Sequence, residues 1–212
     1  MSKECEELHL LFASLKKFEF PFDSKQIPQN GIYILFERGE AGHGTSRIVR
    51  VGTHTGKNQL RSRLEQHFVR ENKDRSIFRK NIGRAILSRD KDPFIHQWEI
   101  DLTTREAIEK FGSTIDIEKK LLVEKIVSEY IQNNFQFVVF AIEDKEERML
   151  FESKIISTLS ACKECGPSDN WLGQYSPKQK IQQSGLWLVN GLNKKPLSEN
   201  EINRLKTLTK AI

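Results

Sequence analysis

The sequence predicts an α+β domain in which a β-hairpin and further strands are surrounded by amphipathic helices. Three observations predict this class. They are the β-branched and aromatic runs at 32–36 and 48–51, the apolar run at 135–142, and the helical spacing of apolar residues in most other segments. No internal repeat, low-complexity tract or linker divides the 212 residues, so we expect a single domain over 1–212.

The N-terminal part of the chain contains a helix followed by the hairpin. Apolar residues recur at helical spacing over 6–18, which predicts a short amphipathic helix that packs on the domain. The strands at 32–36 and 48–51 enclose the segment 38–46, which is rich in glycine and polar residues. This arrangement predicts an antiparallel hairpin with a long, mobile loop.

Helical spacing dominates the rest of the chain, where turn-forming residues separate the elements. Residues 94–100 and the run 135–142 are expected to be strands. In the longest helix, the spacing of Leu121, Leu122 and Ile126 predicts the apolar face. We expect helices over 57–71, 76–87, 116–133, 144–159 and about 199–211.

The composition is that of a globular protein with a heavily charged surface, because 37% of the residues are hydrophobic and 30% are charged. No run approaches the roughly 18 apolar residues of a membrane span, and the N-terminus lacks the basic and apolar regions of a secretory signal. An odd number of cysteines, three, argues against a secreted disulfide framework. We therefore expect an intracellular, cytoplasmic protein without membrane association. The net charge of +5 is too small to identify a partner.

Arg63 and His67 are four residues apart in the predicted helix 57–71, so they share one face at the edge of the apolar stripe. A side chain at such a position can be anchored and still reach a cleft. The alternative is an arginine whose stem covers apolar surface beside a partly buried histidine, with no functional role. Taken alone, the spacing favours this second interpretation.

Glu152 is the acidic residue whose position is hardest to explain structurally. In the predicted helix 144–159 it shares an apolar face with Met149, Ile156 and Leu159. A carboxylate in such a face is costly to desolvate unless it is paired, hydrogen-bonded or bound to a metal ion. The pattern leaves a functional role and a structural pairing with an arginine equally open.

Two further polar features follow residue 160. Asn170, in the loop 167–173, can orient a water, a carboxylate or a phosphate, although an Asn in such a loop usually caps a turn. Cys162 and Cys165 form a lone C-x-x-C pair at a helix end, and no second pair of Cys or His has zinc-like spacing. We therefore do not expect a zinc or redox site at this pair.

Basic residues concentrate between Arg47 and Arg89, with few acids among them. A charge run is usually a solvated face, but this one surrounds Arg63 and His67. A one-sided basic surface is typical of proteins that bind a phosphate backbone. The members that we expect to contact nucleic acid are Arg50, Lys57, Arg61, Arg63, Arg70 and Arg79.

Together these features resemble the motifs of the GIY-YIG nuclease superfamily. Gly31-Ile32-Tyr33 opens the hairpin, Arg50-Val51-Gly52 ends it, Arg63 and His67 follow on a helix, and Glu152 and Asn170 come later. The order of these elements matches the family over about 30–193. The run 47–54 is similar to a subgroup that has Arg-Val-Gly-Thr-His in place of the Tyr-Ile-Gly motif.

The resemblance implies a small mixed or antiparallel sheet flanked by helices. It also implies an endonuclease that hydrolyses phosphodiester bonds of DNA, most simply double-stranded DNA, with one divalent cation, Mg²⁺ or Mn²⁺. The helix 6–18, an insertion at about 101–133 and the helix at about 199–211 are then additions to the family core.

The resemblance further implies a role for each matching residue. Glu152 would bind the metal ion, and Tyr33 would deprotonate or position the attacking water. Arg63 would bind a non-bridging phosphate oxygen and stabilise the transition state, with His67 assisting. Asn170 would support the geometry of the metal site, and hydrolysis would leave 3′-hydroxyl and 5′-phosphate ends.

Arg50 stands where the second motif of the family has a tyrosine. Arginine stays protonated and cannot act as a base, but it can bind phosphate. His54, four residues later, could supply the missing acid-base or hydrogen-bonding group.

Two functions therefore follow from the sequence. The first is a metal-dependent DNA endonuclease, and the second is a nucleic-acid-binding module of the same fold with weak or no catalysis. A purely structural domain would require Tyr33, Arg63 and Glu152 all to be coincidental.

Overall fold

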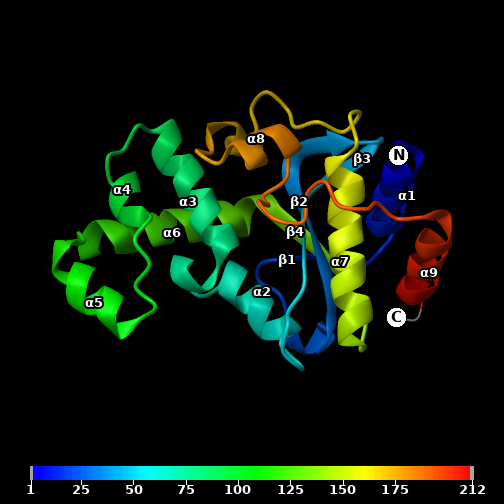
Figure 1. Cartoon of the computed structure of the whole chain (residues 1–212), viewed down its shortest axis with the longest axis horizontal. Helices are drawn as coiled ribbons and strands as arrows, with labels where there is room; N and C mark the ends of the chain where they lie inside the picture. The colour runs from blue at the N-terminus through cyan, green and yellow to red at the C-terminus, as the bar shows by residue number, and fades with distance from the viewer. Residues whose placement is uncertain (1, 211–212) are drawn as a thin grey trace.

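The computed structural model of the protein describes residues 2–210, which form a four-stranded sheet with helices on both faces (Figure 1). The strand order is β1-β4-β2-β3, and every neighbouring pair is antiparallel. The expected α+β class is confirmed, and of the two expected sheet types the antiparallel one is present. The strands are β1 Phe18–Glu19, β2 Gly31–Gly42, β3 Thr45–Gly52 and β4 Phe135–Ala141.

The hairpin of β2 and β3 is longer and tighter than the sequence predicts. Its strands continue through most of the segment 38–46, and only His43 and Gly44 form the turn. These residues have φ angles of 49° and 74°, the left-handed conformation that a type I′ two-residue turn requires. The expected long, mobile loop is therefore wrong, and His43 stands at the tip of a hydrogen-bonded hairpin.

One face of the sheet packs against helices from the middle of the chain. Alternation along β2 directs Tyr33 and Leu35 to this face, and Ile32 and Ile34 to the opposite one. The main helices on the Tyr33 face are α2 Leu60–Phe68, α3 Ile77–Arg89, α4 Ile95–Trp98 and α6 Ile117–Asn134.

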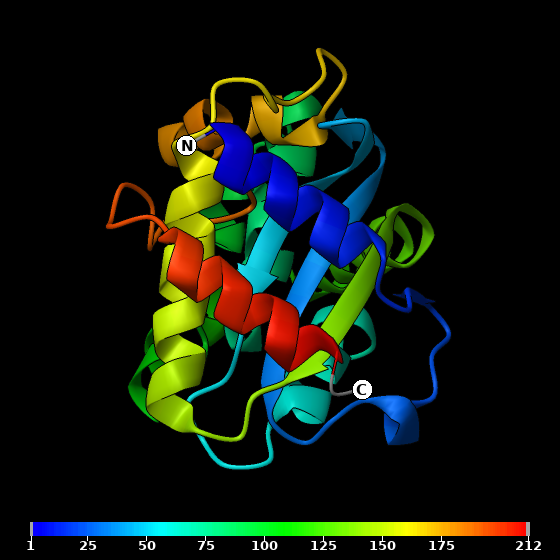
Figure 2. The ribbon, with the colours of Figure 1, turned by 90° about the vertical axis from the view of Figure 1, so that its right-hand side faces the viewer.

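The opposite face is covered by α7 and the two terminal helices, as Figure 2 shows. The Asp144 side chain caps α7 by accepting a hydrogen bond from the backbone N–H of Glu147 at 2.7 Å, as the sequence predicts. The three helices on this face are α1 Ser2–Ala13, α7 Lys145–Ser160 and α9 Glu199–Lys210. The expected end of the last helix at residue 211 lies outside the described residues, as do residues 1 and 212.

Short helices connect the layers. The α5 helix, Arg105–Phe111, precedes α6 in the insertion expected at 101–133, and α8, Gln179–Ser184, follows the loop after α7. None of the described helices is long and apolar enough to cross a membrane. Single 3₁₀ turns lie at Ser24–Gln26, Lys73–Arg75, Gly112–Thr114 and Leu172–Tyr175.

Residues 94–100 do not form the expected strand, because this segment folds back as α4 onto α3. The Trp98 ring fits against Gly83, where a Cβ atom would lie 2.4 Å from the ring. The Trp98 indole donates a hydrogen bond to the carbonyl of Lys80 at 3.0 Å. Packing of one large aromatic side chain thus overrides the strand propensity of the segment.

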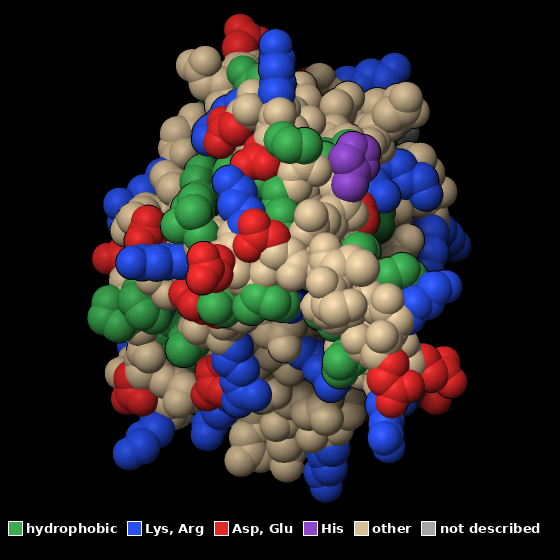
Figure 3. Space-filling view, turned by 90° about the vertical axis from the view of Figure 1, so that its left-hand side faces the viewer, with side chains coloured by type: hydrophobic (Ala, Val, Ile, Leu, Met, Phe, Trp, Pro, Cys, Tyr) green, Lys and Arg blue, Asp and Glu red, His purple; other side chains and the backbone are tan. Residues whose placement is uncertain are grey.

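The apolar face predicted for α6 is not the face that packs on the sheet. All three residues predicted to form it are exposed, and Val123, Val127 and Ile131 are buried instead. The buried face also contains Glu124, which pairs with Arg79 of α3 at 2.8 Å. Hydrophobic side chains are accordingly visible among charged ones at the end of the molecule that carries α4 and α5 (Figure 3).

Candidate active site

Tyr33 lies in β2 opposite Gly52 of β3, and its side chain is buried. The Tyr33 hydroxyl is 2.7 Å from Nε2 of His67 and accepts a hydrogen bond from Nε of Arg50 at 3.4 Å. A Cβ atom at position 52 would lie 2.2 Å from this hydroxyl, so glycine is needed there. The glycine that ends the second strand therefore makes room for the tyrosine of the first.

His67 connects Tyr33 to Ser76 inside the core. Its Nδ1 lies 2.8 Å from Oγ of Ser76, and the residue is fully buried rather than partly buried. Burial, together with the charges of three neighbouring arginines, lowers the pKa of His67 well below its ordinary value. Because a neutral imidazole has one N–H and one acceptor nitrogen, the row Tyr33–His67–Ser76 can pass a proton in either direction.

Arg50 occupies the position that has a tyrosine in the motif, and it contacts Tyr33 directly. It is buried, and its Nη1 donates a hydrogen bond to the carbonyl of Trp187. Its guanidinium lies 5.2 Å from the ring centre of Phe78. These contacts fix the guanidinium between Tyr33 and the cavity beside Glu152, which Arg50 also lines.

His54 does not take the place of the absent tyrosine. Its Nδ1 donates to the carbonyl of Gly56 at 2.6 Å, and its Nε2 accepts from the backbone N–H of Gly31 at 3.4 Å. Burial is the main cause that lowers the pKa of His54, so the ring is neutral. With both nitrogens committed to the backbone, His54 shapes the cavity wall rather than offering an acid or base.

Glu152 projects from α7 past the edge of the sheet toward the end of β3. Its Oε1 accepts a hydrogen bond from the backbone N–H of Thr53 at 3.1 Å. Burial raises the pKa of the Glu152 carboxyl, and the nearby Arg50 and Arg63 act in the opposite direction. The core side of α7 is formed by other residues, such as Phe151, and Glu152 lies at the border of that surface.

Glu152 also marks the junction of two hollows in the surface. One, of about 370 Å³, is lined by Thr53 and Arg63, and the other, of about 510 Å³, is lined by Arg50. Glu152 and Met149 line both. The combined cavity lies where α2 from one face of the sheet and α7 from the other meet at the edge strand β3.

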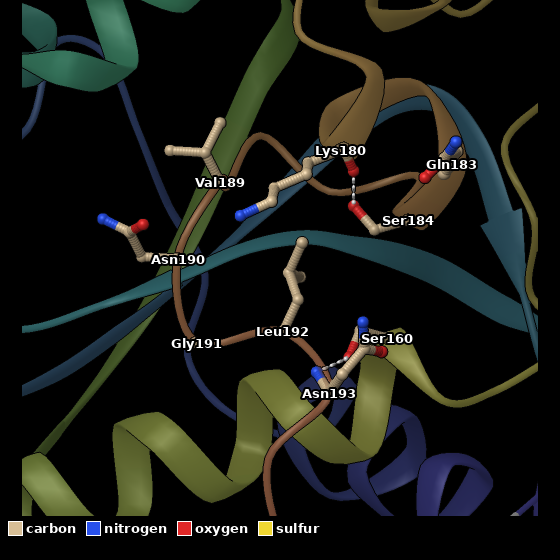
Figure 4. A pocket seen from close by; sticks show the side chains of 9 residues that line it. All are labelled: Ser160, Lys180, Gln183, Ser184, Val189, Asn190, Gly191, Leu192 and Asn193. Atoms are coloured by element: carbon tan, nitrogen blue, oxygen red, sulfur yellow. Dashed lines mark hydrogen bonds between the residues drawn. The ribbon is translucent and has the colours of Figure 1, made fainter.

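A third hollow, of about 260 Å³, continues from the second one. Val189, Asn190 and Gly191 line both, and the Lys180 side chain extends toward Val189 and Asn190 (Figure 4). We refer to the three connected hollows as the Glu152 groove. It runs from Arg63 past Glu152 to Lys180.

Arg63 is held at the wall of the groove by uncharged partners. Its Nη1 donates to Oε1 of Gln66 at 3.0 Å and to the carbonyl of Arg75 at 3.1 Å. The side chain is half-buried, so its stem is anchored on α2 and its charged end reaches the cavity. The position of Arg63 at the edge of the apolar stripe predicts such a side chain, anchored and able to reach a cleft. An arginine held in this way can bind a phosphate.

Asn170 lies outside the groove. It is exposed in the loop after α7, and the asparagines that line the groove beside Glu152 are Asn81 and Asn190. Asn81 is 1% exposed, its Oδ1 accepts from Arg84 at 2.6 Å, and its Nδ2 has no hydrogen-bond partner. A buried, unpaired amide donor is costly unless a ligand completes it. No sequence signal marks Asn81, because it lies within a helix and in no motif.

The basic run from Arg47 to Arg89 does not form the expected one-sided basic surface. Arg79 is fully buried against Glu124, and Arg47 is buried against Glu40. Buried positions of this kind neutralise charge inside the fold instead of presenting it to a partner. The buried basic residues of the run are Arg47, Arg50, Lys73, Arg79, Lys80 and Arg84, and of these Arg50 alone lines the Glu152 groove.

The six residues expected to contact nucleic acid thus divide into three groups. Arg50 and Arg63 line the groove. Lys57 is exposed, and Arg70 is 59% exposed in an ion pair with Glu65. Arg61 and Arg79 are held by the protein itself, Arg61 through the carbonyl of Ile27 at 2.7 Å and Arg79 through its buried ion pair.

The chemistry of the groove fits a single divalent cation. Among the residues described as lining it, Glu152 is the only acid. Mg²⁺ and Mn²⁺ are commonly held by one or two carboxylates, with water and substrate phosphate as the other ligands. Burial raises the pKa of Glu152 although Arg50 and Arg63 act to lower it, and a bound cation would further favour the ionised carboxylate.

Comparison with known proteins identifies a family. A family model for the GIY-YIG domain matches residues 7–212, a range that includes all four strands and the whole Glu152 groove. No curated protein and no solved structure matches the chain.

Proposed function

The chain belongs to the GIY-YIG domain family, whose members are generally endonucleases, and on this premise we propose that it is a divalent-metal-dependent DNA endonuclease. One observation carries the proposal. Glu152, Arg63 and Arg50 line one groove, and Tyr33 lies directly behind Arg50 with His67 next to it. Among the described residues Glu152 forms no ion pair with either arginine, and its carboxylate accepts from the backbone N–H of Thr53, so structural pairing with an arginine does not explain its position.

In this proposal, the two arginines bind the scissile phosphate. Arg63, held by Gln66, donates to a non-bridging oxygen and stabilises the added negative charge of the transition state. Arg50 approaches the phosphate from the second hollow. Asn81 lines the same hollow, and its Nδ2 is a donor without a partner that a phosphate oxygen would satisfy.

Tyr33 and His67 handle the proton of the attacking water. Tyr33 first gives its proton to His67, the neighbouring Arg50 stabilises the phenolate that forms, and the phenolate then takes the proton of the attacking water. Glu152 holds the cation, with Thr53 fixing one carboxylate oxygen. A bound Mg²⁺ or Mn²⁺ would supply Lewis-acid polarisation of the phosphate and would offset negative charge on the leaving 3′ oxygen. The expected products are 3′-hydroxyl and 5′-phosphate ends.

The remainder of the groove suits a duplex backbone. Lys194 lines the hollow next to Glu152, and Lys180 borders the third hollow. Together with Arg63, these residues spread positive charge along the groove on both sides of Glu152. We therefore propose double-stranded DNA as the substrate.

A second candidate is a nucleic-acid-binding module without catalysis. The observation that favours it is the burial of Tyr33, a residue that lines neither hollow beside Glu152. The Tyr33 oxygen also already has two partners, Arg50 and His67. In that case Arg50 and Arg63 bind phosphate, but no group activates water.

Incubation of supercoiled plasmid with the purified protein separates the two candidates. We expect nicking that requires Mg²⁺ or Mn²⁺ and that is lost in both Glu152→Ala and Arg63→Ala. DNA binding that weakens steeply with salt, without cleavage in any divalent metal, would support the binding module and reject the enzyme.

A further inference from the structure

Five side chains with metal-binding chemistry gather beyond the C-terminal end of α7. Cys5 and His9 come from α1, His43 from the tip of the hairpin, and Cys162 and Cys165 from the loop that follows α7. One ligand atom from each of Cys5, His9, His43 and Cys165 lies within 4.8 Å of the other three. All three cysteines of the chain are free thiols. The Glu152 groove uses none of these side chains.

The distances in this cluster suit a tetrahedral ion. Sγ of Cys5 is 3.5 Å from Sγ of Cys165, and Nε2 of His43 is 3.3 Å from Sγ of Cys162. Zinc with Zn–S bonds of about 2.3 Å and Zn–N bonds of about 2.0 Å separates two sulfurs by about 3.8 Å, and a sulfur and a nitrogen by about 3.5 Å. Thiols are weak hydrogen-bond donors and acceptors, so hydrogen bonding explains little of the convergence.

The loop that contains Cys162 and Cys165 presents its sulfurs to the cluster. The C-x-x-C spacing is typical of zinc ligands, and α7 ends immediately before it. The backbone N–H of Glu164 points at Sγ of Cys162 at 3.5 Å. An N–H directed at sulfur favours the thiolate over the thiol, because hydrogen bonds to a charged acceptor are stronger.

His9 borders the cluster, but both of its ring nitrogens have backbone partners. Nδ1 donates to the carbonyl of Cys5 at 2.9 Å, and Nε2 accepts from the N–H of Ile48 at 3.2 Å. The ring therefore joins α1 to β3, with its centre 5.1 Å from the ring centre of His43. Cys162, whose Sγ lies 3.3 Å from Nε2 of His43, is the alternative fourth ligand, which gives a set of three thiols and one imidazole.

We propose that Cys5, His43, Cys162 and Cys165 bind one Zn²⁺ ion. Binding converts the three thiols to thiolates and releases three protons to solvent, while neutral His43 contributes a nitrogen lone pair. Three thiolates and an imidazole select Zn²⁺ over Mg²⁺ or Mn²⁺, which prefer oxygen ligands. Four protein ligands leave no open position, so the ion is structural.

The ion would connect segments that are far apart in the sequence, because His43 and Cys162 are 119 residues apart and Cys5 and Cys165 are 160 residues apart. It joins α1 and the hairpin tip to the end of α7. The hairpin carries Arg50 and α7 carries Glu152, so the site braces two elements of the groove from a distance.

The test is metal analysis of the purified protein, followed by Co²⁺ titration of the metal-free form. We expect one Zn²⁺ per chain. We expect Co²⁺ to give the strong visible bands of a tetrahedral site and a thiolate-to-cobalt band in the near ultraviolet. His43→Asn should weaken Co²⁺ binding well beyond tenfold, since changes outside the ligands themselves already cost about 10–100-fold. Asn accepts the positive φ at this turn, so the variant should fold.

His96→Asn, on α4, is the matched control and should bind Co²⁺ as the wild type does. Cys162→Ser should weaken the thiolate-to-cobalt band, and an unchanged band would overturn the ligand set. A folded protein without metal that gives no thiolate band with Co²⁺ would overturn the site. So would a Cys5–Cys165 disulfide in protein purified without reductant, recognised by a mass lower by two hydrogens.

Discussion

Arg63 and Arg79 come from the same basic run of the sequence, but they end in regions of opposite character. In the Glu152 groove, Arg63 is half-buried and is held by an amide and a carbonyl, so its charge is left for a ligand. Between α3 and α6, Arg79 is fully buried and paired with Glu124. Charge density along a chain therefore does not show which charges face a substrate, and burial and pairing decide it.

The largest expected effect on stability concerns the interior region. Replacing Arg79 with Met removes one partner of a buried pair and leaves the Glu124 carboxylate without its ion-pair partner. We expect a loss of about 3–5 kcal/mol in the free energy of unfolding, measured by urea denaturation.

The double variant Arg79→Met/Glu124→Met is the control for this prediction, because it removes both charges at once. It should recover most of the lost free energy of unfolding. A loss below about 1 kcal/mol in the single variant would mean that the buried pair of Arg79 does not stabilise the fold. It would contradict the distinction between a structural Arg79 and a ligand-binding Arg63.

The next largest effect is on the rate of nicking when a residue of the Glu152 groove is changed. Arg63→Ala should slow metal-dependent plasmid nicking about 10²–10³-fold, because the transition state loses a preorganised donor. Its free energy of unfolding should stay within about 0.5 kcal/mol of wild type, because the hydrogen-bond partners of Arg63 are an amide and a carbonyl and no described carboxylate forms an ion pair with it. Arg105→Ala, at a position that is 92% exposed on α5, is the matched control and should change neither quantity.

Tyr33→Phe tests the hydrogen bonds behind the groove. Loss of the hydroxyl should lower nicking roughly 10²-fold and the free energy of unfolding by about 1 kcal/mol. Tyr175→Phe, at a residue that is 48% exposed, should leave both unchanged. Full nicking activity in Tyr33→Phe would show that the buried row Tyr33–His67–Ser76 carries no proton.

The smallest expected effect is a pH dependence of stability. The pKa of His67 is lowered in the folded protein, whereas the unfolded chain binds a proton near the ordinary value of 6.5. Stability from neutral His67 is therefore present above that pH and is lost as the pH falls below it. His67→Gln should show a shallower loss of urea midpoint between pH 6.5 and about 5. An equal slope in both proteins would contradict a neutral, buried His67.

The sequence predicts the elements whose signals are local. The hairpin strands, the strand at 135–142 and the capped helix at 144–159 follow from periodicity and from Asp144, and they are present. The segment 94–100 and the apolar face of α6 were predicted wrongly. There the outcome depends on Trp98 reaching Gly83, and on Glu124 reaching Arg79, which are contacts between distant segments.

The same distinction applies to the functional residues. Tyr33, Arg63 and Glu152 belong to a recognisable order of motifs, and the structure brings the last two to one groove, with Tyr33 behind Arg50. Asn170 had only its place in that order and lies elsewhere, while Asn81 had no signal. The partners of the C-x-x-C pair are far away in the sequence, so no spacing rule could find them.

The most direct measurement of the central claim is the rate of Mg²⁺- or Mn²⁺-dependent nicking by Glu152→Gln beside Glu146→Gln. Both residues lie on α7, but Glu146 is exposed and outside the groove. Burial raises the pKa of Glu152, so its neutral replacement should not lower stability at neutral pH. We expect Glu152→Gln to lose about 10³-fold or more in rate and Glu146→Gln to match wild type. Equal rates in the two variants would contradict the assignment of the groove as the nuclease centre.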